Sequence, residues 1–306
     1  MPGINSWFAL IWQTETLHLF NVTMYIQKNI LLAGTNNKQM PLDIFYPADG
    51  PRPVIVYVHG FNGFKDWANF DLIATQFAEN GFCFVKFNFS HGGTSPEAPE
   101  EFVDPEAYGH NNYTKELYDL QQVIDWTLSD TNPHRAAIDH TRVFLIGHSR
   151  GGGIALLKAS GEKRIKALTT WASVSQSKTP WGSWPPERLQ KWKETGVDWY
   201  TNSRTGQQLP LYYQLYEDYA ANRQRLDIPA AVKQLKVPLL ICHGTADEAV
   251  AVQNAGVLKD AASDATLFLV ESDHVFGRKH PWPHSSLPLP MQAVVDKTMA
   301  FFKSHT

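Results

Sequence analysis

Cysteine is scarce in this sequence. The 306 residues include two cysteines, Cys83 and Cys242, and both lie in apolar stretches typical of buried strands. Two isolated cysteines of this kind indicate core packing and support neither a disulfide framework nor a metal site. The fold must therefore be stabilised by its hydrophobic core, which a chain of this length is large enough to form.

The sequence also has little excess charge and no long hydrophobic run. Its formal net charge of −3 gives no electrostatic reason to expect nucleic acid or an anionic membrane as a partner. No apolar stretch reaches the length needed to span a bilayer. The hydrophobic content of 43% and the charged content of 19% are those of an ordinary globular protein. Composition says nothing about the oligomeric state.

Basic residues are missing from the beginning of the sequence, where the first Lys or Arg is Lys28. The apolar run Trp7–Trp12 has neither a basic segment before it nor a small-residue cleavage site after it, which argues against a secretory signal peptide. We therefore expect a cytoplasmic protein. Met24 begins a more ordinary domain start, so residues 1–23 are expected to be an appended extension or a mis-assigned translation start.

Strand-like apolar runs alternate with helical stretches along most of the chain. Continuous apolar runs such as Val54–Val58 are typical of strands that are buried on both faces and joined by crossover helices. Two earlier runs, Met24–Leu32 and Met40–Tyr46, predict an antiparallel hairpin at the sheet edge. We expect an α/β fold with a mainly parallel sheet flanked by helices, formed by residues 24–175 and 235–306.

The pattern changes between residues 176 and 234. Four of the ten Trp residues and five of the eleven Tyr residues fall in this segment, and no clear strand is visible. We interpret residues 176–234 as a small helical cap inserted between two core strands. Aromatic residues at such a junction pack the cap onto the core, and some of them are expected to line a ligand pocket.

A strand, a glycine-flanked serine and a helix follow one another directly in the middle of the chain. Val143–Ile146 predicts a buried strand and Ile154–Ala159 predicts a helix, with Gly147-His148-Ser149-Arg150-Gly151 between them. Such a turn needs small residues because the backbones approach closely and the central residue is strained. The pattern predicts a nucleophile elbow that presents the Ser149 hydroxyl beside a helix N-terminus.

A serine hydroxyl needs a base within hydrogen-bond reach and a third group that orients this base. Asp247 follows the predicted strand Val237–Cys242, and His274 follows the predicted strand Ala265–Glu271. Both are therefore expected at the same sheet edge as Ser149. We predict Ser149 as the nucleophile, His274 as the general base and Asp247 as the acid that fixes the His274 tautomer.

Each predicted partner has alternatives. Glu248 and Asp273 are the other candidate acids. His59 and His243 end strands directly before a glycine, which favours a structural hydrogen-bonding role. The other histidines weighed are His91, His110, His148, His280 and His284. No metal-ligand spacing such as H-E-x-x-H occurs, so we predict no metal site.

The predicted reaction also needs two hydrogen-bond donors for an oxyanion. One is the backbone N–H of Arg150, the residue after the nucleophile. The other should come from the loop after the strand Val54–Val58, where the backbone N–H of Phe61 is the best candidate.

Four motifs together resemble those of the α/β-hydrolase superfamily. They are His59-Gly60-Phe61, Gly147–Gly151, His243-Gly244-Thr245-Ala246-Asp247 and Asp273-His274. The resemblance is nearest to the branch of dienelactone-hydrolase-like proteins, feruloyl and cinnamoyl esterases and prolyl-oligopeptidase-type catalytic domains. It implies an α/β-hydrolase fold. The dienelactone hydrolases proper use a cysteine at the elbow, where this chain has Ser149.

The motifs and the resemblance predict a serine hydrolase that cleaves short-chain or aryl carboxylic esters through an acyl-enzyme, without a cofactor. The expected partner is a small-molecule ester. One alternative is a serine peptidase or aminopeptidase, although the segment 176–234 offers no carboxylate cluster to hold a substrate amine. The other alternative is a ligand-binding protein that keeps the fold without turnover.

Overall fold

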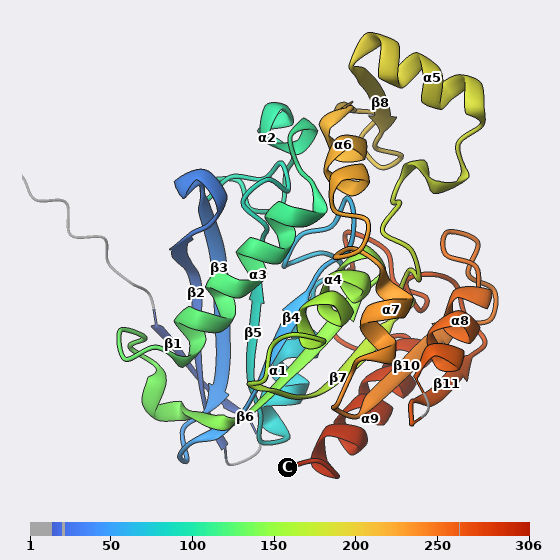
Figure 1. Cartoon of the computed structure of the whole chain (residues 1–306). Helices are drawn as coiled ribbons and strands as arrows, with labels where there is room; N and C mark the ends of the chain where they lie inside the picture. The colour runs from blue at the N-terminus through green and yellow to red at the C-terminus, as the bar shows by residue number, and fades with distance from the viewer. Residues whose placement is uncertain (1–13, 20–21, 263) are drawn as a thin grey trace, which may run out of the picture.

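A nine-stranded sheet crosses the molecule. The computed structural model describes residues 14–19, 22–262 and 264–306, and within them the strands lie in the order β1-β2-β3-β5-β4-β6-β7-β10-β11 (Figure 1). Their bounds are β1 (Thr14–Leu19), β2 (Val22–Ala33), β3 (Gln39–Pro47), β4 (Arg52–Val58), β5 (Cys83–Phe87), β6 (Ile138–His148), β7 (Ile165–Trp171), β10 (Leu239–Gly244) and β11 (Thr266–Val270). The six neighbouring strands β5, β4, β6, β7, β10 and β11 pair in parallel, which confirms the predicted mainly parallel sheet.

The N-terminal strands extend this sheet in antiparallel fashion. β2 and β3 form the predicted hairpin, with Ile26 opposite Phe45 and Leu32 opposite Met40. The prediction that this hairpin forms the sheet edge is wrong, because β1 pairs with the outer side of β2. β1 belongs to the expected extension 1–23, of which residues 1–13 and 20–21 lie outside the described residues. Its run of mixed polar and apolar residues carries no strong strand signal.

Helices cover both faces of the sheet. One face carries α1 (Asp71–Glu79) and α9 (Leu289–Lys303), and the other carries α3 (Tyr113–Leu128), α4 (Arg150–Ala159), α7 (Ile228–Lys233) and α8 (Gln253–Ala261) (Figure 1). In strand β4, the continuous apolar run Val54–Val58 is explained by burial on both faces. Val54 and Val56 enter one core, whereas Ile55 and Tyr57 enter the other.

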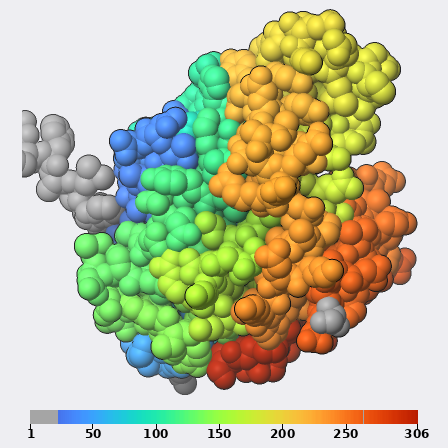
Figure 2. All heavy atoms as spheres, viewed as in Figure 1, coloured from blue at the N-terminus to red at the C-terminus, as the bar shows by residue number. Residues whose placement is uncertain are grey.

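The segment 176–234 forms the upper part of the molecule in Figure 2, in yellow and orange. Its elements are η3 (Trp181–Ser183), α5 (Pro186–Thr195), β8 (Val197–Thr201), β9 (Gln208–Tyr212), α6 (Gln214–Ala221) and the core-packed α7. The helices were predicted, but the expectation of no strand is wrong, because β8 and β9 pair antiparallel with Val197 opposite Tyr212. Between β5 and α3, the chain also forms one short helix, α2 (Pro105–Gly109).

Two expectations from the sequence concern the cysteines and the length of apolar segments. Cys83 and Cys242 are both fully buried in strands, as core packing predicts. Among the described residues, no helix combines the length and the apolar character required to cross a membrane.

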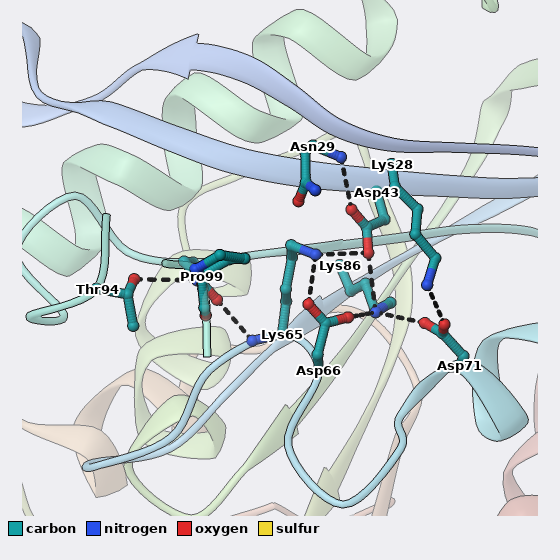
Figure 3. Close-up of polar contacts among 10 residues, drawn as sticks. Lys28, Asn29, Asp43, Lys65, Asp66, Asp71, Lys86, Thr94 and Pro99 are labelled. Carbon is teal, nitrogen blue, oxygen red and sulfur yellow. Dashed lines mark hydrogen bonds and ion pairs between the residues drawn. The ribbon is translucent and has the colours of Figure 1, made fainter. Parts of the chain in front are cut away.

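Two buried lysines and three aspartates form the centre of a charge cluster beside the N-terminal half of the sheet, and Lys28 extends it by pairing with Asp71 (Figure 3). Lys65 Nζ and Lys86 Nζ lie 2.8 Å and 2.9 Å from Asp43 Oδ2, and all three side chains are buried. Lys86 Nζ also lies 2.7 Å from Asp71 Oδ1, and both lysines contact the carboxylate of Asp66. Each carboxylate of the cluster thus has an ammonium partner from the chain itself. Because Lys65 directly follows the loop 59–64, the cluster also anchors the end of that loop.

We expect Asp66 to contribute stability that disappears in acid. Burial alone would raise the pKa of Asp66, but Lys86 and Lys65 outweigh it and hold the pKa below its ordinary value. The folded state therefore binds fewer protons at this site than the unfolded chain, so the contribution is present above about pH 4 and is lost as the pH falls further. The Tm difference between wild type and Asp66→Asn should shrink between about pH 6 and pH 3. Asp130→Asn, at a carboxylate that is 90% exposed, is the control, and a Tm difference independent of pH would contradict the prediction.

Candidate functional site

Ser149 lies at a strained turn between β6 and α4. Its backbone has φ 56° and ψ −123°, a conformation that is unfavourable for a residue with a side chain. The two flanking positions must be glycine because neighbouring backbone atoms leave no room for a Cβ. A Cβ at Gly151 would lie 2.3 Å from the carbonyl oxygens of both Val58 and His59, and one at Gly147 would lie 2.4 Å from the Gly151 oxygen. The turn therefore has the steric character that the sequence predicts for an elbow.

Asp247 and His274 meet at the carboxyl ends of β10 and β11. His274 Nδ1 lies 2.8 Å from Asp247 Oδ2. The other carboxylate oxygen, Oδ1, accepts the backbone N–H groups of Val250 at 2.8 Å and Ala249 at 3.0 Å. Both oxygens of Asp247 are therefore held by hydrogen bonds, and Asp247 binds the Nδ1 edge of the imidazole.

Asp247 is ionised at neutral pH. Burial alone would raise its pKa, but hydrogen bonds involving His243 and His274 outweigh this effect and hold the pKa of Asp247 well below its usual range. His243 Nε2 lies 3.3 Å from Asp247 Oδ2 and 2.8 Å from the carbonyl oxygen of Val250. An ionised carboxylate at this position keeps the proton of His274 on Nδ1.

Ser149 and His274 line the same cavity, which has a volume of about 850 Å³. His148, the residue before Ser149, also lines this cavity, and its Nε2 is 3.0 Å from the carbonyl oxygen of His274. The His148 and His274 rings pack with their centroids 4.8 Å apart. Burial, and next the neighbouring His274, lower the pKa of His148 well below its ordinary value, so His148 is neutral and donates this hydrogen bond. Among the hydrogen bonds of the described residues, none joins the Ser149 hydroxyl to the His274 ring.

The loop after β4 approaches Ser149 closely. A Cβ at Gly60 would lie 2.9 Å from the Ser149 Cβ, so only glycine fits there. Phe61 follows Gly60 in a turn closed by the hydrogen bond from Gly63 N–H to the Gly60 oxygen at 3.2 Å. In the turns and caps of the described residues, neither the Phe61 N–H nor the Arg150 N–H donates to a backbone carbonyl. Within the described residues, both predicted donors thus keep a backbone N–H group without a backbone acceptor.

The Arg150 side chain is held apart from this chemistry. Its guanidinium is buried and lies 3.0 Å from the carboxylate of Glu116, 3.1 Å from the carbonyl oxygen of Thr179 and 4.1 Å from the centre of the Tyr113 ring. These contacts hold the side chain of Arg150 at the first turn of α4 and outside the lining of the cavity.

The aromatic wall of the cavity does not come from the segment in which we predicted it. Of the nine Trp and Tyr residues in the segment 176–234, which the structure describes throughout, only Tyr200 lines the cavity. The rest mainly pack together, as Trp184 and Trp192 do with ring centroids 5.2 Å apart. The wall is formed instead by core loops, through Phe61, Phe64, Trp67 and Phe102.

The alternative residues have other contacts. Asp273 accepts the backbone N–H groups of Val275 and Gly277, and Glu248 is exposed. His59 Nδ1 lies 2.9 Å from the Gly60 oxygen, which agrees with the structural role expected for it. Of the other candidate histidines, His91, His110, His243 and His284 lie outside the cavity lining, whereas His148 and His280 belong to it. Arg278 also lines the cavity, and no motif in the sequence marks it.

Comparisons with known proteins agree with this architecture. Residues 53–200 match the family model described as the α/β-hydrolase fold. The esterase domain of a Rhodothermus marinus protein is 17% identical with a TM-score of 0.60, and the match covers 92% of this chain and 98% of that one. Est1E from Butyrivibrio proteoclasticus, solved with ferulic acid bound, is 16% identical with a TM-score of 0.59, covering 95% and 98% of the two chains.

A puromycin-hydrolysing peptidase from Mycobacterium tuberculosis is 14% identical with a TM-score of 0.60, and the match covers 98% of this chain and 40% of that one. No sequence among the curated proteins matches this chain. The family match over the central residues and the shared architecture together identify the chain as a protein of the α/β-hydrolase fold, as its motifs predict.

Proposed function

We propose that the protein is a serine hydrolase that cleaves carboxylic esters, with Ser149, His274 and Asp247 as its catalytic triad. One observation carries this proposal. Asp247 holds the ring of His274 by a 2.8 Å hydrogen bond, and this ring lines the cavity that also contains Ser149 at its strained turn. A nucleophile, a base and an orienting acid are the parts that serine hydrolysis requires.

The proposed reaction proceeds in two halves. Ser149 Oγ attacks the ester carbonyl carbon while His274 Nε2 takes the hydroxyl proton, and the imidazolium is stabilised by Asp247. The N–H groups of Phe61 and Arg150 bind the oxyanion, each contributing about 3 kcal/mol to transition-state stabilisation. The alcohol leaves with the proton from His274, and water then hydrolyses the acyl-enzyme by the same route. No step requires a cofactor.

We further propose that the substrates are short-chain or aryl esters and that the segment 176–234 acts as a cap over the site. The aromatic wall of the cavity suits a planar ring, and Tyr200 brings one residue of the cap into it. Two similar structures, an esterase domain and a complex with ferulic acid, support an ester substrate.

Labelling with a fluorophosphonate probe tests this proposal. The probe should modify wild-type protein stoichiometrically at Ser149, and p-nitrophenyl acetate should be hydrolysed. Hydrolysis should fall as the acyl chain of p-nitrophenyl esters lengthens. A folded protein that neither reacts with the probe nor turns over any ester of the panel would favour the ligand-binding alternative.

The peptidase alternative is disfavoured by the charge of the cavity. An aminopeptidase holds the amine of its substrate with carboxylates, and no Asp or Glu is found among the described residues that line this cavity. If the protein hydrolysed an aminoacyl anilide faster than p-nitrophenyl acetate, the peptidase function would be favoured over the esterase function.

A further inference from the structure

The side chain of Arg150 links the nucleophile turn to the neighbouring helix. Arg150 is the first residue of α4, which lies beside α3 below the segment 176–234 (Figure 1). Its guanidinium meets the first turn of α3, where Tyr113 and Glu116 are three residues apart and therefore share a helix face. The ring of Tyr113 covers the guanidinium at 4.1 Å, and Nε lies 3.0 Å from Glu116 Oε2. All three side chains are buried.

This contact is balanced in charge by the chain itself. Burial alone would lower the pKa of Arg150, but Glu116 and Tyr113 outweigh it and raise the pKa, so the guanidinium is charged. The second oxygen of Glu116 accepts the side-chain N–H of Asn111 at 2.7 Å. A guanidinium that is paired in this way needs no anionic ligand, which indicates that Arg150 has a positioning role.

The same two helices also hold the backbone of Thr179. Arg150 Nη1 donates to the Thr179 carbonyl oxygen at 3.1 Å, and the Tyr113 hydroxyl accepts the Thr179 N–H at 3.0 Å. Thr179 lies outside the helices and strands, and it takes part in no backbone–backbone hydrogen bond of the described turns and loops. Its place is therefore set by these two side chains, and we call Tyr113, Glu116, Arg150 and Thr179 the Arg150 clamp.

The clamp fixes one wall of the large cavity. Thr179 lies within the segment 178–183, of which five residues line the cavity together with Ser149. These residues are Lys178, Thr179, Pro180, Gly182 and Ser183. Because Arg150 directly follows Ser149, the wall is joined to the nucleophile turn through a single side chain. A wall that is held in this way cannot retreat to admit additional methylene groups.

We propose that Tyr113 and the Arg150 side chain are positioning residues for substrate size: they hold the segment 178–183 against the nucleophile turn and so limit the length of the substrate chain that fits beside Ser149. Neither residue belongs to the described lining of the large cavity, so both act through Thr179. This inference rests on the proposed esterase function.

The variant Tyr113→Phe tests the proposal. It keeps the ring on the guanidinium but removes the hydroxyl that accepts the Thr179 N–H, so the wall should relax. Two ester pairs are compared, because the wall can face either side of the ester: p-nitrophenyl acetate with p-nitrophenyl hexanoate, and ethyl acetate with hexyl acetate. The ratio of kcat/KM for the short ester to that for the long one should fall by about 3- to 10-fold in at least one pair, as expected for the loss of one hydrogen bond.

Tyr118→Phe is the matched control, because Tyr118 lies on the same helix but is 50% exposed and outside the cavity lining. Its ratios should equal those of wild type. Arg150→Lys, which keeps the charge but loses the planar fork that reaches both Glu116 and Thr179, should lower the ratio in the same direction as Tyr113→Phe. If neither buried variant folds, amide exchange on the wild-type protein decides. The Thr179 N–H should exchange at least about a hundredfold more slowly than an unstructured amide, and exchange at the unprotected rate would overturn the clamp.

The outcomes separate this inference from the function on which it rests. A clamp that serves stability alone would lower the Tm of Tyr113→Phe and slow the short and the long ester by the same factor. Unchanged ratios in both pairs would therefore overturn the positioning role and leave the esterase function standing, and so would a rise in the ratios. Absence of turnover with all four esters, together with no fluorophosphonate labelling, would overturn the esterase function and this inference with it.

Discussion

Replacing Ser149 with alanine is expected to lower kcat/KM for p-nitrophenyl acetate by about four to six orders of magnitude. The variant loses the only atom that can form the acyl-enzyme, while the cavity and the backbone N–H groups of Phe61 and Arg150 remain. Alanine keeps the Cβ, so the strain at φ 56° is the same in both proteins and the Tm should not change. The comparison is made by steady-state kinetics, with circular dichroism to verify the fold.

The matched control for this prediction is Ser160→Ala, at the other end of α4. The Ser160 hydroxyl donates to the carbonyl oxygen of Leu157 at 2.9 Å and lies outside the cavity lining. Its replacement should leave both labelling and hydrolysis intact. A Ser149→Ala protein that retains a tenth or more of the wild-type kcat/KM would mean that another group attacks the ester, and the proposed mechanism would be wrong.

The elbow was predictable because its constraints are local. A glycine on each side of Ser149 is demanded by carbonyl oxygens less than 3 Å from a Cβ, and a strand before and a helix after are visible in the same short stretch. Asp247 and His274 could be proposed as partners because each follows a strand of a parallel sheet. Their 2.8 Å hydrogen bond itself depends on loop geometry that the spacing along the chain does not contain.

Features that depend on distant packing could not be predicted. Burial of Arg278 is created by Trp67 and Phe70, more than two hundred positions earlier in the chain. Clustering of Trp and Tyr in the segment 176–234 is equally compatible with rings that line a pocket and rings that pack on each other, and the structure has mainly the second arrangement. Among the described strands, β8 and β9 pair only with each other, and each has five residues, so neither gives the long apolar run of a central strand.

Replacing Asp247 with asparagine should lower kcat by about ten thousand-fold, chiefly through the tautomer of His274. In the folded protein, Asp247 Oδ1 faces the N–H groups of Ala249 and Val250, and Oδ2 faces His274 Nδ1. An asparagine must keep its oxygen toward the two backbone donors, so its NH₂ group faces His274. The ring must then accept at Nδ1 and carry its proton on Nε2, where it can no longer take a proton from Ser149.

Asp273→Asn is the control that distinguishes this effect from a general loss of negative charge near His274. The Asp273 Oδ1 accepts the N–H groups of Val275 and Gly277, and an asparagine oxygen can do the same. Because these two hydrogen bonds are kept, we expect Asp273→Asn to keep kcat within about a factor of ten of wild type, which corresponds to a change of at most about 1.4 kcal/mol in the activation free energy. A larger loss in Asp273→Asn than in Asp247→Asn would transfer the role of the acid to Asp273. Equal and small losses would mean that neither carboxylate orients the base, and the hydrogen bond between Asp247 and His274 would then be structural alone.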